Sequence, residues 1–147
     1  MTRIPEKDRD IMELAIYLPM VLTILNRDLG VIENSPFKLK KPYKEFVEET
    51  MKAVQKELSG VKAYMKANNL KVMETKRDEA FTMFLFLYNG YEEYHNYFNP
   101  RIRNRVQELM EYYFIGRHRS GEEAAAKQHT GSPSVQGPSR SGISRAK

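Results

Sequence analysis

Apolar residues recur every three or four positions through the first half of the chain, as on one face of an α-helix. Between residues 6 and 28 this stripe is wide, which predicts a helix contacted on more than one side. Pro19 lacks a backbone N–H and is expected to kink or divide this helix. The stripe consists of Ile11, Leu14, Ile16, Leu18, Met20, Val21, Ile24 and Leu25.

A second helix is predicted from Pro42 to about Ala67, because proline suits the first turn of a helix. Gly30 and Ser35-Pro36 mark the loop before it. The apolar seam of this helix is shorter than three heptads, which favours a bundle helix over an independent coiled coil. Its members are Val47, Met51, Val54, Leu58, Val61 and Met65.

The aromatic stretch after residue 75 also fits helical spacing, with Thr75 and Asp78 as a variant capping box. Residues 70–74 before it are expected to be extended. Gly90 inside this helix would cost about 1 kcal/mol relative to alanine, so we expect either a close helix crossing or a break into two helices there. The shared face would carry Phe81, Phe84, Leu85, Tyr88, Tyr91, His95 and Phe98.

A fourth helix is predicted to start at Asn99-Pro100, a cap followed by a first-turn proline, and to end at Gly116. Residues 117–147 are rich in Gly, Ser and Pro and are predicted to be disordered, because they cannot bury enough apolar surface to fold. The sequence therefore predicts an all-α protein: a single bundle of four to five helices in residues 1–116, followed by a disordered basic tail in 117–147.

The charge distribution bears on nucleic-acid binding. The net charge is +5, but residues 117–147 hold six basic and two acidic residues, a net +4. Residues 1–116 hold 18 basic and 17 acidic residues, so the predicted folded part has no strong field to attract a polyanion.

Several classes of function are disfavoured by composition. The sequence has no cysteine, which excludes disulfides and thiol catalysis and fits a cytoplasmic setting. The apolar run 11–25 is too short to span a bilayer, and Glu13 and Pro19 interrupt it, so we expect a buried core helix and no membrane association. Ser35 and Ser59 lack a nucleophile context, and we expect neither an enzyme nor a cofactor.

Glu92 and His95 have the i,i+3 spacing of half a carboxylate-bridged di-iron site. A complete site needs a second such pair and two more glutamates, which this chain does not supply. We therefore expect no metal, with His95 at the edge of the core and Glu92 in water.

Arginines crowd the first turns of the predicted fourth helix, where the helix end disfavours positive charge by about 0.3–1 kcal/mol each. Two explanations stay open: neighbouring carboxylates, or an anion or partner held by the guanidinium groups. The arginines are Arg101, Arg103 and Arg105, and the candidate carboxylates are Glu92, Glu93 and Glu108.

Two further groups could join such a surface. The lysine group of the loop before Pro42 is either a solvated loop or an anion-contact patch; it comprises Lys38, Lys40 and Lys41. Tyr94 and Tyr97 lie off the main apolar face of the predicted helix and are expected at the surface, where tyrosine and arginine mark interfaces.

The stretch NGYEEYHNYFNPRIRNRVQELMEYYF, residues 89–114, resembles small uncharacterised helical proteins carried by phages and prophages of Gram-positive bacteria. The resemblance rests on the pattern GYE…YFNP.IR within residues 80–115. It implies a bacterial cytoplasmic setting and a viral origin, and it carries no active site.

The sequence thus favours a non-enzymatic interaction module that docks a protein partner, or a second copy of itself, through a tyrosine–arginine surface. The alternative is a nucleic-acid-binding accessory protein whose phosphate contacts come from the 101–105 arginines and the basic tail.

Overall fold

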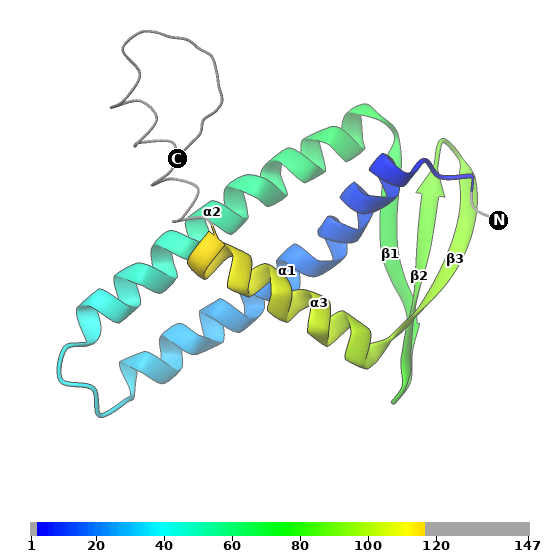
Figure 1. Ribbon diagram of the computed structural model, residues 1–147. Coiled ribbons are helices and arrows are strands. Elements are labelled where there is room, and N and C mark those ends of the chain that lie inside the picture. Colours follow the sequence, from blue (N-terminus) through cyan, green and yellow to red (C-terminus); the bar gives the residue numbers. More distant parts are fainter. Residues whose placement is uncertain (1–2, 117–147) are drawn as a thin grey trace, which may run out of the picture. The chain divides into compact units, whose positions relative to one another are not determined.

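Two long helices, a three-stranded sheet and a shorter helix follow one another in the computed structural model, which describes residues 3–116 (Figure 1). The chain order is α1 (Glu6–Glu33), α2 (Lys40–Ala67), β1 (Leu70–Arg77), β2 (Phe81–Tyr88), β3 (Tyr91–Phe98), α3 (Asn99–Glu111) and a π-helical turn, η1 (Tyr112–Gly116). The prediction of an all-α bundle of four to five helices is therefore wrong, and the protein belongs to the α+β class.

The error concerns residues 75–98, which are not helical but belong to an antiparallel meander over residues 70–98 with strand order β1-β2-β3. The cause is the turn between β2 and β3. Asn89 and Gly90 both have positive φ, 50° and 85°, and Tyr88 pairs with Tyr91 on either side of them. Two positive φ values in a two-residue loop are the requirement of a tight β-hairpin, and Asn-Gly is its preferred sequence. Gly90 thus reverses the chain and does not sit at a helix crossing.

Side chains of β2 alternate between two faces with a period of two. Thr82, Phe84 and Phe86 are buried on the inner face, which they share with Tyr97 of β3. The predicted helical face combined residues that the strands place on opposite sides, because both faces of β2 are apolar and the alternation is hidden in the sequence. The expectation that residues 70–74 are extended is confirmed by β1.

Helices α1 and α2 form an antiparallel hairpin, and the seam of α2 is close to the prediction. In α1 only four of the eight predicted stripe residues are buried, Ile24 is exposed, and Met12 and Tyr17 are buried although they were not predicted. Five of the six predicted seam residues of α2 are buried, and Met51 is half-buried. Helix α1 continues through Pro19 without dividing and through Gly30 to Glu33, so it is longer than predicted. The buried residues of α1 are Met12, Ile16, Tyr17, Leu18, Val21 and Leu25.

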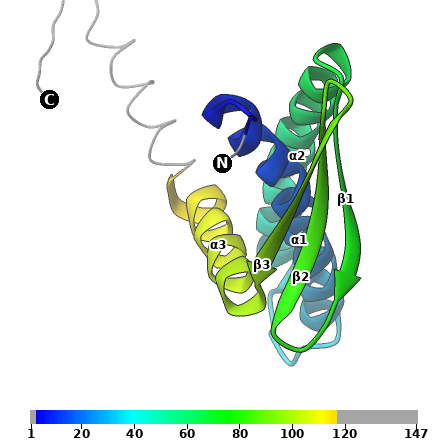
Figure 2. The same ribbon diagram turned by 90° about the vertical axis from the view of Figure 1, so that its right-hand side faces the viewer.

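The inner face of the sheet packs against this hairpin, with β1 in contact with both helices. Asn69, with a φ of 54°, joins α2 to β1. The Tyr97 hydroxyl of β3 donates a hydrogen bond to Glu13 of α1 at 2.6 Å, and this contact joins residues 84 positions apart. The hydrophobic core therefore lies between the helical hairpin and one face of the sheet, with α1 and α2 behind the sheet in Figure 2.

Helix α3 begins at Asn99, as predicted. The Asn99 side chain donates to the carbonyl groups of Asp78 and Glu79 and accepts from Thr82 at 2.6 Å. These bonds fix the start of α3 to the turn between β1 and β2. Its apolar stripe, Ile102, Val106 and Leu109, is buried.

The described residues fall into two compact units, the first ending at Met110 and the second beginning at Glu111. In the described part of the second unit, the rings of Tyr112 and Tyr113 meet edge to face with centroids 5.2 Å apart. The predicted disordered tail, residues 117–147, lies outside the described residues.

Candidate interaction surface

One face of the sheet is covered by no described helix, and Figure 2 looks onto it. We call it the outer face. On the central strand every outward position is apolar: Phe81, Met83, Leu85 and Leu87. An antiparallel sheet with one solvated face normally carries polar residues there. Exposed large side chains continue the patch from Phe81, which is 39% exposed, onto the neighbouring strands, where Met73, Tyr94 and Phe98 are 46%, 59% and 49% exposed.

The strand register arranges the outer face in rows that run across all three strands. One row joins Met73, Leu85 and Tyr94. The next joins Lys71, Leu87 and Glu92, so a positive charge stands on one edge strand and a negative charge on the other. A contiguous exposed apolar patch with a polar rim is typical of a protein–protein contact surface.

The two predicted surface tyrosines lie on opposite faces, because residues three apart on a strand point in opposite directions. Tyr94 is exposed on the outer face, as expected. The surface position predicted for Tyr97 is wrong, since its side chain is only 6% exposed on the inner face. Its ring stacks on Phe86 with centroids 6.3 Å apart and meets Phe84 edge to face at 5.6 Å.

Tyr97 belongs to a polar cluster between α1 and β3. Burial, together with the hydrogen bond to Glu13 and the charge of that carboxylate, raises the pKa of Tyr97 well above its usual range. Burial also raises the pKa of Tyr17 on α1, and the charge of Glu13 adds to the effect. The cluster thus joins α1 to β3 through the hydrogen bond from Tyr97 to Glu13.

The three arginines are exposed on α3 but do not form one group. Arg101 and Arg105 lie one helical turn apart and close enough to Tyr17 to lower its pKa in part. Arg105 also pairs with Glu108 at 3.2 Å. Arg103, two residues from each, points elsewhere around the helix.

Glu13 acts on the same Tyr17 phenol as Arg101 and Arg105, so a carboxylate of α1 lies in this region; sequence reasoning missed it because α1 and α3 are distant in the chain. Among the carboxylates it did name, Glu108 pairs with Arg105, and Glu93 accepts hydrogen bonds from His95 and from the Arg3 backbone. A negative charge near helix-end arginines offsets their unfavourable position.

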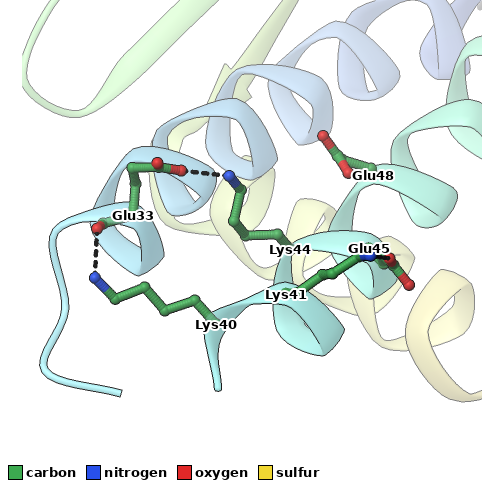
Figure 3. A pocket seen from close by; sticks show the side chains of 6 residues that line it. All are labelled: Glu33, Lys40, Lys41, Lys44, Glu45 and Glu48. Carbon is green, nitrogen blue, oxygen red and sulfur yellow. Dashed lines mark hydrogen bonds and ion pairs between the residues drawn. The ribbon is translucent and has the colours of Figure 1, made fainter. Parts of the chain in front are cut away.

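Lys38 lies in the α1–α2 loop, and Lys40 and Lys41 lie in the first turn of α2. In Figure 1 the α1–α2 loop lies away from the sheet and from the start of α3. Figure 3 shows a shallow pocket beside this loop, in which Lys40 donates to the Glu33 carbonyl at 2.9 Å and Lys44 pairs with the Glu33 carboxylate. The hydrogen bond from Lys44 lowers the pKa of Glu33. Lys41 lies 3.8 Å from Glu45, and Lys38 is exposed. These contacts hold the hairpin end together, and the structure does not bring the lysines next to the arginines.

The two residues of the candidate metal site do not lie together. Glu92 and His95 are three residues apart in β3 and project from opposite faces. The His95 ring lies 4.8 Å from that of Phe86, and its Nε2 lies 2.7 Å from Glu93. Among residues 3–116, no three His, Asp or Glu side chains are grouped so that they could hold a metal ion.

Helix α1 is long and apolar enough to cross a membrane by length and composition, with a mean hydropathy of 1.4 in its most apolar window. In this structure 28% of that window is buried, and its seam packs against α2. A core helix can meet the same criteria.

The fold and this surface define a small α+β protein in which a helical hairpin supports a sheet with an open apolar face. The chain belongs to the YhjD protein family, whose model matches residues 3–118. It is 48% identical, over 115 residues, to the uncharacterized protein YhjD of the Gram-positive bacterium Bacillus subtilis (strain 168). The aligned region makes up 78% of this chain and 96% of that relative. No solved structure matches the chain.

Proposed function

We propose that this protein is a non-enzymatic, cytoplasmic interaction module that docks a protein partner through the outer face of its sheet. The observation that carries the proposal is the outer side of β2, where four consecutive outward positions are apolar although no described element covers them. Burying such surface against a partner contributes about 25 cal/mol for each Å² removed from water.

The composition of the outer face supports a protein partner. Tyr94, Phe98, Met73 and Met83 supply the aromatic and thioether groups that are enriched in protein interfaces. Lys71 and Glu92 supply charges at the rim. Of the predicted tyrosine–arginine surface, only Tyr94 is part of the surface proposed here. Tyr97 belongs to the core, and the arginines lie on α3.

The experiment is site-specific photo-crosslinking with p-benzoylphenylalanine in place of Tyr94. Irradiation of cells that produce this variant is expected to give discrete adducts heavier than the protein itself. The matched control replaces Lys62, an exposed residue of α2, and should give none. The proposal would be refuted by the absence of any adduct at position 94, or by equal adducts at both positions.

Nucleic-acid binding is the alternative function, and the exposed Arg103 on α3 is the group that favours it. Phosphate contacts would make affinity fall steeply with salt, by a slope of about 0.9 per phosphate on duplex DNA. A salt titration with arbitrary DNA and RNA tests this, and deletion of residues 117–147 shows whether the tail alone carries the affinity.

We also propose that the protein originates in phage or prophage genomes, on the basis of the resemblance of residues 80–115. The relative in Bacillus subtilis agrees with the Gram-positive setting that this resemblance implies. Integrase and structural phage genes beside the encoding gene would support the origin, and a setting of housekeeping genes would oppose it.

A further inference from the structure

From the charges on the outer face we infer that its partner is a second copy of this chain, packed face to face about a two-fold axis parallel to β2. The inference rests on the proposed function, since it names the occupant of the same surface. Two-fold dimers are the commonest symmetric assemblies, and their interface is the same patch on both copies.

The register determines what such an axis brings together. Rotation about an axis along the central strand places β1 of one copy opposite β3 of the other. Lys71 and Glu92 stand in one row on these two edge strands, so each faces the opposite charge of the partner, and the contact occurs twice. In the neighbouring row Met73 faces the Tyr94 ring, a favourable pairing of sulfur with an aromatic group.

The central strand supplies the apolar middle of this interface. Met83, Leu85 and Leu87 lie on or beside the axis and meet their own counterparts. Aligned sheets pack about 30° apart because each is twisted, and this rotation displaces the outer rows by a few ångströms. Long Lys and Glu side chains can span that displacement, whereas short side chains at the edges could not.

The charges also discriminate against the other face-to-face arrangement. An axis across the strands would place each strand over its own copy in reverse, so that Lys71 would approach Lys76, the outward residue near the other end of β1. Like charges opposed across an interface weaken it and suppress that mode of association. The pattern of charges therefore selects the axis along the strands.

The size of the face indicates whether the dimer is permanent or reversible. Three strands of eight residues, about 4.8 Å apart with about 3.4 Å per residue, outline a patch of roughly 14 Å by 27 Å, or about 380 Å². This footprint is about half the ~800 Å² that each partner buries in a standard interface. We therefore expect a reversible dimer that forms at high protein concentration, and not a permanent one.

Charge exchange in the full chain, followed by sedimentation equilibrium over a concentration series into the high micromolar range, tests the inference. Lys71→Glu and Glu92→Lys should each weaken the dimer about tenfold or more, because each opposes like charges twice. The double variant K71E/E92K should restore most of the wild-type affinity. Lys62→Glu makes the same charge change on an exposed site of α2 and should leave association unchanged.

Circular dichroism confirms that each variant is folded; all three sites are exposed, so their folds should persist. The inference that the partner is a second copy is overturned if the wild-type chain stays monomeric throughout the series. It is also overturned if the double variant dimerises no more tightly than the single variants. If the chain is monomeric while position 94 crosslinks a different protein in cells, the proposed function stands and this inference falls. An adduct of twice the chain mass, from purified protein and from cells, supports both.

Discussion

The Tyr97 hydroxyl links two elements that are distant in the chain, and its removal tests how the sheet is attached to the helices. Tyr97→Phe keeps the ring against Phe84 and Phe86 but removes the donor 2.6 Å from Glu13. A hydrogen bond to a charged group contributes about 1.5–3 kcal/mol. Glu13 is half-buried and retains access to water, so we expect a loss in the free energy of unfolding of about 1.5–2 kcal/mol.

Urea denaturation monitored by circular dichroism measures this loss. With a slope of about 2 kcal/mol per molar urea, the midpoint should fall by about 1 M. Tyr94→Phe is the matched control, because it removes the same hydroxyl from the same strand on the exposed outer face, and it should change stability by less than about 0.5 kcal/mol. Equal losses in the two variants, or a silent Tyr97→Phe, would show that the faces of β3 are assigned incorrectly.

Three further predictions follow from the sheet and its turn. Phe86→Ala should lower the free energy of unfolding by about 3–5 kcal/mol, because the ring is fully buried; Phe98→Ala on the outer face should lower it by much less in the same urea titration. Gly90→Ala should destabilise by about 1 kcal/mol or more, because φ is +85° there, whereas Gly60→Ala inside α2 should stabilise by about 0.5–1 kcal/mol; thermal melts distinguish the two. The free energy of unfolding should fall as the pH rises above about 10, because the pKa of Tyr97 is raised in the fold and the unfolded chain loses that proton first. Tyr97→Phe should flatten this part of a stability–pH profile. An unchanged slope would contradict the burial of the phenol.

The helices were accessible from the sequence because their signals are local. The seam of α2 and the start of α3 at Asn99 depend on residues within a few positions of one another. The start of α1 at Glu6 agrees with the prediction for the same reason. Pro19 is tolerated inside α1, and the Thr23 hydroxyl donates to its carbonyl group.

The sheet was missed because two signals competed. Apolar residues on both faces of β2 imitate a helical stripe, and periodicity alone does not separate the two in such runs. Asn89-Gly90 is the local signal for a hairpin, but a glycine inside an apparent helical stripe also fits a helix crossing or a break. Aromatic and β-branched residues around it, such as Thr82 and Phe84, also favour strands.

The predicted tyrosine–arginine surface was affected by the same confusion of strand with helix. A helical interpretation put Tyr94 and Tyr97 on one surface, whereas a strand puts them on two. Glu13 could not be assigned to this region from the sequence, because its contact with Tyr97 spans 84 positions. The outer face itself is visible in the sequence once the hairpin is recognised, as alternate positions from Phe81 to Leu87.

The order of elements along the chain has a consequence for how the protein folds. The β-meander pairs strands that are adjacent in the chain, so its contacts are local and can form quickly. The contact between Glu13 and Tyr97 closes a much longer loop and is expected to form after the folding transition state. Weakening that contact should therefore speed unfolding while refolding keeps nearly its wild-type rate, as for a contact with a φ-value near zero.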